Sequence, residues 1–478
     1  MTLGDQARRA VFWNTGFTLF RDVLQFGLML ILVRLVALEA YGQFGLVTSI
    51  IGFLQVFSFE PFVTYTLQVR QPEQVRYQEH FTAGAFFQIG LFVCTHLSAY
   101  VLGYIESYAT VAPVLHVMSV AWLLDWPSTL RIKMLERDLD WHRLRLLHAL
   151  GLCSATVLSL GLAWAGAGLY ALCLPGLLKR VVFLIDLFVC YGWRPTWTWH
   201  AKHYAPAWRF GLSRMASTLL VSGRKLLESS CYVHLAGFTG FAIFGRATGL
   251  THLVCGKFAL LIMQALYPVL TKIDPTSDTY RQKSGVAMRN VACVVLPLRG
   301  VCTLLASPTV RLLYGDRWLE AIPLIPWAMA TGVIGALTHT AYVLSLAAHH
   351  KQRCLRADAG VLLGTGLALG GLLPHSAQAY LLGLCTIQVY TLFYLWSSLY
   401  TAWLHASTDL VKMLAKPTVA TLCAWLICET VRFSLDASLD DLPAAGGYTV
   451  GFLISYIGVM RIGFTEQFDE FISYLPSR

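Results

Sequence analysis

The chain has 478 residues, of which 56% are hydrophobic and only 13% charged, and its mean hydropathy is +0.59. Soluble domains carry about 25% charged residues, so the composition excludes a soluble domain and predicts an all-α polytopic membrane protein. The formal net charge of +10 comes without a soluble basic patch, which excludes a nucleic-acid-binding protein.

Apolar runs of about 20 residues, the length that spans the hydrocarbon of a bilayer, recur along nearly the whole chain. They predict about fourteen transmembrane helices, beginning near residues 11, 41, 81, 109, 147, 168, 207, 237, 286, 320, 356, 377, 414 and 446. The first run follows Arg8 and Arg9 as in a signal peptide, but it is about 25 residues long and no clean cleavage site follows. We therefore expect it to remain as the first helix.

Cationic residues are distributed unevenly over the predicted connections. If the N-terminus is cytoplasmic, 23 of the 36 Lys and Arg residues fall in inside connections and three fall in outside connections. Cytoplasmic connections of membrane proteins are enriched in Lys and Arg. The distribution therefore predicts that both termini are cytoplasmic, on a basic face that suits anionic lipid headgroups.

A weak internal echo occurs at an offset of 200 residues. The stretch VRLVALEAYGQFGLV from Val33 aligns with VHLAGFTGFAIFGRA from Val233, with four matching positions. Many transporters are built from two repeats, with the substrate path between them. We therefore predict a six-helix lobe at 1–200, a second at 201–405, and an additional helix pair at 406–478.

Five further stretches follow one another in the order LVRLVALEAYGQFGLV, MLERDLDWHRL, GFAIFGRATGL, ALYPVLTKI and LLYGDRWLEAIPLIPWA. In this order and spacing they resemble the Wzx-type polysaccharide flippases of the multidrug/oligosaccharidyl-lipid/polysaccharide exporter superfamily. The second span departs from the family pattern, because FSFEPFV lacks the glycine that more often follows the acidic residue. The role of Glu60 is therefore left open.

The resemblance implies a V-shaped bundle of two six-helix lobes in the bacterial inner membrane. It also implies that an undecaprenyl-diphosphate-linked oligosaccharide moves from the cytoplasmic to the periplasmic leaflet by alternating access, for exopolysaccharide, capsule or O-antigen synthesis. The expected substrate is then the lipid-linked oligosaccharide, and a polysaccharide polymerase and chain-length proteins are candidate partners.

Ten cations fall within the predicted spans, where each costs on the order of 2.5 to 3.5 kcal/mol. Arg21 lies about 15 Å into the first span, and Arg34 lies near its outer end, where it can snorkel. In the seventh and eighth spans, two cations share a helix face at a spacing of eleven residues. A guanidinium can hold phosphate oxygens with a planar fork of donors, so we predict a cationic cavity for the diphosphate. The predicted substrate-binding residues are Arg21, Arg34, Arg214, Lys225, Arg246 and Lys257.

Pairing with intramembrane acids is the alternative explanation for these cations. Arg21 and Asp22 are expected to pair poorly, because adjacent side chains point apart on a helix. The other candidate pairs are Arg224 or Lys225 with Glu228, and Lys179 or Arg180 with Asp186 or Asp125. Since five acids face ten cations, a positive excess would remain. The candidates for ion coupling are Glu60, Asp125 and Asp186, because buried carboxylates can titrate near neutral pH.

The remaining chemical signals are weak. The twelve cysteines stand singly without CxxC pairs, and His349 and His350 lack metal-ligand spacing. We therefore expect neither a metal site nor a cofactor. The tryptophans near residue 200 are expected to anchor the chain at the membrane interface, although aromatic rings also stack on sugars; they are Trp193, Trp197, Trp199 and Trp208.

Two alternative functions remain. A cation-coupled multidrug exporter of the same superfamily would need a net acidic cavity, which the charge count opposes. A membrane polysaccharide polymerase or ligase would present a long periplasmic loop with catalytic groups, whereas the longest outside connections have about 10 to 15 residues. We therefore expect a transporter rather than an enzyme.

Overall fold

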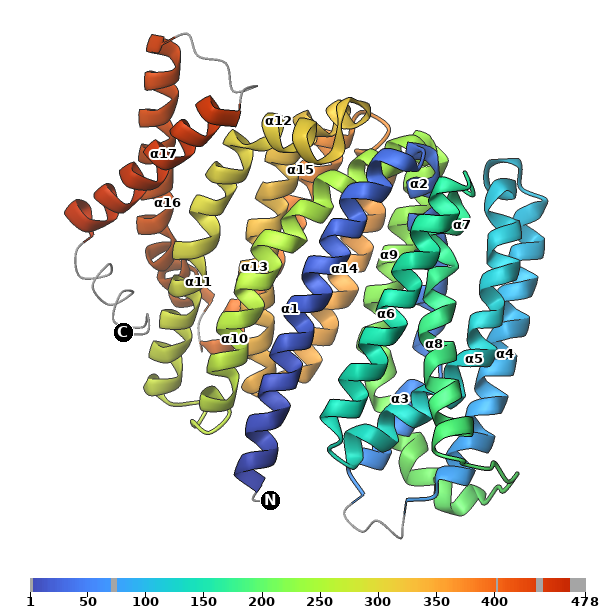
Figure 1. Cartoon of the computed structure of the whole chain (residues 1–478). Coiled ribbons are helices and arrows are strands. Elements are labelled where there is room, and N and C mark those ends of the chain that lie inside the picture. Colours follow the sequence, from blue (N-terminus) through green and yellow to red (C-terminus); the bar gives the residue numbers. More distant parts are fainter. Residues whose placement is uncertain (1–2, 70–74, 401–402, 436–441, 465–478) are drawn as a thin grey trace. The chain divides into compact units, whose positions relative to one another are not determined.

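The computed structural model describes residues 3–69, 75–400, 403–435 and 442–464. Every regular element in these ranges is helical (Figure 1). By its contacts the chain divides into two compact units, Met1–Ala242 and Ile243–Arg478. The predicted lobes, which end after residues 200 and 405, are a different division and stay a prediction.

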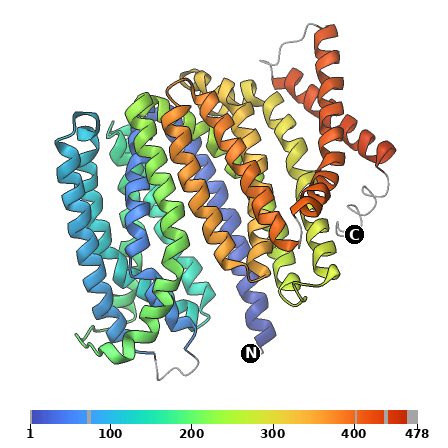
Figure 2. The ribbon, with the colours of Figure 1, turned by 180° about the vertical axis from the view of Figure 1, so that it is seen from behind.

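The first unit consists of long helices joined by short 3-10 and π-helical pieces. Its elements are α1 (Leu3–Leu35), α2 (Leu38–Leu54), η1 (Gln55–Phe57), α3 (Glu60–Val63), η2 (Thr64–Leu67), α4 (Tyr77–Gly103), η4 (Glu106–Val111), α5 (Ala112–Arg137), α6 (Trp141–Trp164), α7 (Leu169–Cys173), α8 (Pro175–Ile185), the π-helical η5 (Asp186–Cys190) and most of α9 (Ala201–Thr251). Within this unit, α1 packs along α6, α4 packs along α5, and α8 packs against α5 and α6 (Figure 2).

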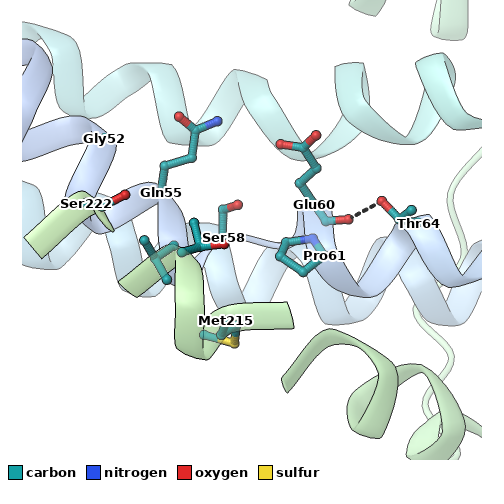
Figure 3. A pocket seen from close by; sticks show the side chains of 10 residues that line it. Gly52, Gln55, Ser58, Glu60, Pro61, Thr64, Met215 and Ser222 are labelled. Atoms are coloured by element: carbon teal, nitrogen blue, oxygen red, sulfur yellow. Dashed lines mark hydrogen bonds between the residues drawn. The ribbon is translucent and has the colours of Figure 1, made fainter. Parts of the chain in front are cut away.

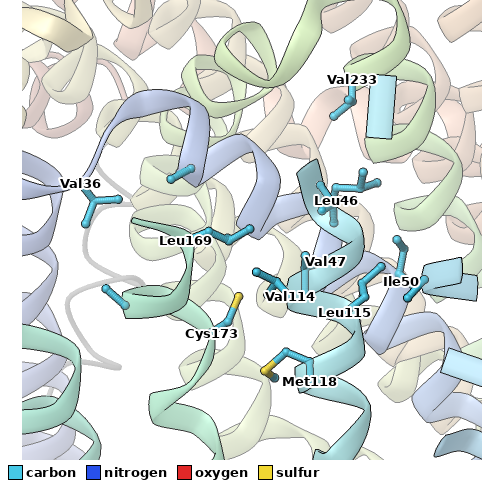
Figure 4. Close-up of a cluster of buried hydrophobic side chains, with 14 of the residues drawn as sticks. Val36, Leu46, Val47, Ile50, Val114, Leu115, Met118, Leu169, Cys173 and Val233 are labelled. Carbon is cyan, nitrogen blue, oxygen red and sulfur yellow. The ribbon is translucent and has the colours of Figure 1, made fainter. Parts of the chain in front are cut away.

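An apolar core joins α1, α2, α5 and α7 of the first unit (Figure 4). Leu46 and Val47 of α2 and Leu115 of α5 are almost completely buried in it. Lipid tails are as apolar as leucine, so association of membrane helices depends on close van der Waals packing rather than on escape from water. This core therefore holds the unit together through its fit.

Glycines of α2 allow it to approach the later part of α9 closely. A Cβ atom at Gly42 would overlap the carbonyl oxygen of Phe238, and one at Gly45 would overlap the ring of Phe241. Both glycines belong to the first stretch of the sequence echo and both phenylalanines belong to the second. The two echo stretches therefore lie against each other.

The helix α9 is two helices that meet at Gly237, whose φ of 71° and ψ of 175° are not helical. Glycine adopts positive φ without the steric penalty of a side chain. A straight helix of this length would extend about 76 Å, more than twice the hydrocarbon thickness of a bilayer. The predicted start of a new helix near residue 237 coincides with this break.

The second unit begins within α9 and is also helical. Its further elements are the π-helical η6 (His252–Gly256), α10 (Lys257–Leu270), α11 (Asp278–Leu304), α12 (Ala306–Thr309), the π-helical η7 (Val310–Tyr314), η8 (Asp316–Leu324), α13 (Ile325–Ala347), α14 (Lys351–Gly371), α15 (Ala377–Trp396), η9 (Ser397–Leu399), α16 (Trp403–Leu435) and α17 (Leu442–Gly463). In this unit α11 packs against α13, α16 and α17. Two buried tyrosine hydroxyls form hydrogen bonds between these helices. Tyr280 of α11 donates to the carbonyl oxygen of Leu344 in α13 at 2.7 Å, and Tyr456 of α17 donates to the carbonyl oxygen of Cys293 in α11 at 3.0 Å.

Eleven helices of the described part are long and apolar enough to cross a membrane, which fits a multi-pass membrane protein. The predicted count of about fourteen is not confirmed. One stretch, Met215–Gln264, contains the break at Gly237 and counts once. The predicted span near residue 168 is divided into α7, α8 and η5, and α14 begins with a strongly charged turn.

A buried carboxylate joins three elements of the first unit. Asp186 of η5 accepts a hydrogen bond from Nε of Arg131 in α5 at 2.6 Å, and its other oxygen accepts from Nη2 of Arg143 in α6 at 2.7 Å. The side chains of Arg131 and Asp186 are only 2% and 4% exposed. Both arginines are among the 23 cations predicted for cytoplasmic connections, whereas they lie within helices and Arg131 is buried.

The segment 192–200, which precedes α9, has no regular structure but is fixed along the first turns of α4. Gln78 of α4 donates to the carbonyl oxygen of Arg194 at 3.0 Å and accepts from the backbone of Thr196 at 2.7 Å. His200 Nδ1 lies 3.0 Å from the carboxylate of Glu79. Side chains of α4 thus bind an extended chain by its backbone.

The network around Asp186 gives a stability prediction. We expect Asp186→Ala to lower the free energy of unfolding by roughly 3 to 5 kcal/mol, because it leaves the buried Arg131 guanidinium without its acceptor. The matched control is Glu429→Ala, which breaks a more exposed ion pair with Arg432 and should cost about 0 to 1 kcal/mol. Thermal unfolding of the purified protein in detergent would measure both. Equal melting temperatures of the two variants would contradict the structural role of Asp186.

Candidate functional site

A polar cavity opens in the first unit between the end of α2 and α9 (Figure 3). Its volume is about 340 Å³, which lies in the usual range of small-molecule sites. Its lining is rich in hydroxyl, amide and carboxylate groups. The lining residues are Gly52, Gln55, Val56, Ser58, Glu60, Pro61, Thr64, Met215, Thr218 and Ser222.

The cavity lies where the chain leaves regular helix after α2. Ser58 has extended backbone, with φ −72° and ψ 170°, and the short α3 starts at Glu60 with Pro61 in its first turn. Proline is tolerated in the first turn of a helix, where its missing N–H group would be unpaired in any case. The sequence FSFEPFV therefore ends one helix and begins another, and it places Glu60 at the junction.

Two polar groups of the cavity are available to a ligand. Ser58 is 1% exposed, and its hydroxyl has no hydrogen-bond partner within the described residues. A buried hydroxyl without a partner costs about 1 to 3 kcal/mol. The carboxylate of Glu60 is exposed and forms no ion pair within the same residues. Figure 3 shows Gln55, Ser58 and Glu60 directed to the same side.

One face of α9 supplies the other wall of the cavity. Thr218 and Ser222 line the cavity, and Lys225 lies seven residues after Thr218 and three after Ser222, on the same face of the helix. The Lys225 side chain is exposed. Position 214 falls one turn before Thr218 on this face, although the side chain of Arg214 lies outside the described residues. Two of the predicted cation positions therefore flank the cavity along α9.

A second group of cations extends over α1, α6 and α8. Arg145 is within electrostatic reach of Glu136 and, less strongly, of Arg21, and His148 is within reach of Arg145 and Lys179. Neither Arg145 nor Lys179 forms an ion pair within the described part of the chain. Arg145 is oriented instead by Asn14, whose Oδ1 accepts from its Nε at 2.5 Å. We call Arg21, Arg145 and Lys179 the cation row.

Arg21 itself pairs with its neighbour in the sequence. Its Nε and Nη2 both donate to Oδ1 of Asp22, at 3.1 and 3.0 Å. The expectation that adjacent residues would pair poorly was wrong, because the long arginine side chain reaches around the helix surface to the shorter aspartate. The pair is 42% and 35% exposed, so solvent or a ligand can reach it.

The three candidates for ion coupling have different surroundings. Asp125 accepts a hydrogen bond from Nε of Arg180 at 2.9 Å, which is one of the pairs that the sequence suggested. Asp186 is held by Arg131 and Arg143 rather than by Lys179 or Arg180. Glu60 alone of the three lines the cavity and lacks an arginine partner in the described ranges.

The other predicted cations occupy different environments. In the second unit, the guanidinium carbon of Arg246 lies 5.7 Å from the ring centre of Tyr314 and 5.2 Å from that of Trp318, distances at which a cation is attracted by the ring face. Lys257, also in the second unit, is exposed. Arg34 is exposed at the end of α1 in the first unit. The structure brings Lys225 to the cavity and Arg21 to the cation row.

Sequence reasoning missed Arg145 and Lys179 as candidate site residues. Arg145 was assigned to a connection because it stands near Arg143 in a charged stretch, and Lys179 was treated only as a partner of an acid. The spacing of Arg145 and His148, at i and i+3, was the available signal, because it places both on one face of α6.

Comparison with known proteins identifies the family. A family model described as "Polysaccharide biosynthesis protein" matches residues 31–323. The succinoglycan biosynthesis transport protein ExoT of Rhizobium meliloti (strain 1021) is 20% identical over 446 residues, which cover 90% of this chain and 88% of that protein. The teichuronic acid biosynthesis protein TuaB of Bacillus subtilis (strain 168) is 19% identical over 280 residues, 58% of this chain and 51% of that protein.

The fold has a solved counterpart. The lipid II flippase MurJ in an inward closed conformation superposes with a TM-score of 0.75 at 13% identity, over 95% of this chain and 99% of that one. The likeness shows a common fold. Because the family model covers more than half of the sequence, the chain belongs to the family of polysaccharide biosynthesis proteins.

Proposed function

We propose that the protein is a flippase that moves undecaprenyl-diphosphate-linked oligosaccharide repeat units from the cytoplasmic to the periplasmic leaflet, for exopolysaccharide, capsule or O-antigen synthesis. The observation that carries the proposal is the cavity of the first unit, where groups suited to sugar hydroxyls stand beside Lys225. Family membership and a relative named as a succinoglycan transport protein support it. The shared fold with a lipid II flippase supports it as well.

The lining of the cavity suits a sugar better than it suits an isolated anion. Hydroxyl, amide and carboxylate groups can together donate to and accept from sugar hydroxyls. A carboxylate would repel a phosphate in the same place, whereas Lys225, one turn further along α9, can attract it. The cavity and its flank thus combine a sugar-binding part with an anion-binding part.

The cation row offers a second place for the negative charge of the diphosphate. Its positive charge is only partly cancelled, because Asp22 pairs with Arg21 while Lys179 and Arg145 form no ion pair in the described part. A charge-assisted hydrogen bond to phosphate is roughly twice as strong as a neutral one. In this proposal Arg34 and Arg214 of the first unit, and Arg246 and Lys257 of the second unit, are further anion-binding positions.

Glu60 is proposed as the group that couples transport to an ion. An ionised carboxylate can accept hydrogen bonds from a sugar, and it can also take up a proton or a sodium ion when the sugar has left. A group that both ligands share would link the movement of one to the release of the other. Asp125 and Asp186 are assigned a structural role instead, because each is already paired with arginine.

Transport rather than catalysis is proposed, in the bacterial inner membrane and with both termini cytoplasmic. A polysaccharide polymerase and chain-length proteins are the proposed partners. The alternative, a multidrug exporter for organic cations, would need a predominantly acidic cavity. Lys225 beside the cavity and the cation row on α1, α6 and α8 weigh against that alternative.

The orientation can be tested by labelling with an impermeant thiol reagent. In a cysteine-free variant, a single cysteine at Glu106 should react from outside, whereas one at Arg137 or Lys283 should not, because the positive-inside distribution places the last two in the cytoplasm. Labelling in the reverse pattern would invert the proposed direction of transport.

A second prediction concerns charge at the proposed anion-binding positions. We expect Lys225→Ala, and separately the double variant Arg145→Ala with Lys179→Ala, to lower polymer production at least about tenfold, the loss expected for a charged hydrogen bond of about 1.5 to 3 kcal/mol. Lys225→Arg should retain much of the activity because it keeps the charge. Polymer would be measured in a flippase-deleted strain, together with the membrane abundance of each variant.

The matched control for charge removal is Lys412→Ala, an exposed residue of α16 outside the proposed site. It should leave polymer production unchanged. Normal polymer from both alanine variants at normal abundance would eliminate the anion-binding role.

A third prediction separates coupling from simple binding at Glu60. Glu60→Gln keeps hydrogen-bonding groups for a sugar but cannot exchange a proton or bind a cation by charge. We therefore expect residual transport in membrane vesicles that no longer responds to an imposed proton or sodium gradient. Glu60→Ala should lose transport altogether. A gradient response of Glu60→Gln equal to that of the unchanged protein would show that the coupling group lies elsewhere.

A further inference from the structure

Two histidines meet at one end of the α4–α5 pair, on helices that contribute no residue to the cavity. His96 lies seven residues before the end of α4, and His116 lies four residues after the start of α5. Their Nδ1 atoms are 3.2 Å apart, and their ring centres are 4.3 Å apart with an interplanar angle of 59°. His96 is exposed and His116 is partly exposed.

The two histidines are within hydrogen-bond distance of each other, but their rings depart from a linear arrangement. A linear Nδ1–H···Nδ1 bond of this length would place the ring centres about 5.5 Å apart, because both lone-pair axes would lie on one line. The observed 4.3 Å shows that the two rings are tilted away from that line, so the contact between the two nitrogens is bent.

The distance between the nitrogens also suits one bound ion. Imidazole nitrogens bind zinc at about 2.0 to 2.1 Å, and a tetrahedral angle then separates two such nitrogens by about 3.4 Å. The 3.2 Å between the Nδ1 atoms lies within a few tenths of an ångström of this value. Two ligands of one tetrahedral ion at these bond lengths have ring centres about 5.2 Å apart, so both rings must rotate from their observed separation of 4.3 Å for their lone pairs to reach one ion.

The helices hold the two rings in register. Trp122 of α5 donates from Nε1 to Oγ1 of Thr95 in α4 at 2.7 Å, and this buried hydrogen bond fixes the helices next to the histidines. Phe92 stacks on His96 with ring centres 5.6 Å apart. A site on packed helices needs little ordering when an ion binds.

We propose that His96 and His116 form a two-ligand site for a divalent transition-metal ion that prefers imidazole, such as Zn²⁺, Cu²⁺ or Ni²⁺. No group of three or more His, Cys, Asp or Glu residues that could hold a metal occurs in the described part of the chain. Water therefore completes the coordination, and the ion exchanges readily. Cu²⁺ binds most tightly of the three, as expected for nitrogen ligands. The bound ion links α4 to α5.

The test uses the purified full-length protein in detergent, without a polyhistidine tag. Zn²⁺ and Cu²⁺ are titrated separately by calorimetry into the unchanged protein, His96→Ala, His116→Ala and the double variant. We expect each single variant to lose one bound ion or to bind it at least about tenfold more weakly, because one imidazole remains. The double variant should lose the same single ion and no second one. The matched control, His375→Ala, removes an exposed histidine elsewhere and should bind as the unchanged protein does.

Two results would overturn the proposal. One is binding by both single variants equal to that of the unchanged protein, and the other is additive loss in the double variant, which would mean two independent histidines. Size-exclusion profiles and melting temperatures check that the variants fold. If an alanine variant does not fold, the electron paramagnetic resonance spectrum of the unchanged protein with one equivalent of Cu²⁺ decides. Two coupled nitrogens support the site, and one or none refutes it.

Discussion

The packing of the first unit depends on the buried carboxylate of Asp186. Removing a carboxylate and a guanidinium from water costs several kcal/mol per ion, which only close pairing offsets. Because Arg131 belongs to α5, Arg143 to α6 and Asp186 to η5, the pairing fixes three elements at once. The ion pair of Arg180 with Asp125 connects α8 to α5 a second time. These helices therefore behave as one block.

The same block presents the cations that the proposed transport uses. Lys179 is next to Arg180, and Arg145 is two residues after Arg143, yet in each case one residue is paired with an acid while the other forms no ion pair in the described part. Neighbouring side chains on a helix point in different directions, so one helix can carry a structural charge on one face and a ligand-binding charge on another. Ion pairing offsets the desolvation cost of Arg143 and Arg180. Arg145 and Lys179, which form no ion pair in the described part, stay accessible to an anion.

The helical class could be predicted from the sequence, because hydropathy is a local signal. Glu60 was a candidate for ion coupling, but FSFEPFV was assigned to the second span, and the break between α2 and α3 was not predicted. The pairing of Asp186 with Arg131 could not be predicted, since 55 positions separate the two residues and no periodicity relates them. The predicted count of about fourteen spans is not confirmed, for a similar reason. Hydropathy alone does not reveal that the stretch after residue 168 is broken into three pieces. The cavity beside Lys225 depends on how α9 packs against η1 and α3, which no pattern within either segment encodes.

The attachment of segment 192–200 to α4 has a mechanical consequence. Nine unattached residues could extend about 30 Å, and such a slack tether would let the start of α9 move without disturbing its neighbours. The hydrogen bonds of Gln78, and the contact between Glu79 and His200, hold the segment against α4 and remove that freedom of movement. A displacement at the start of α9 therefore also displaces the first turn of α4. The segment acts as a rigid connection between the two helices.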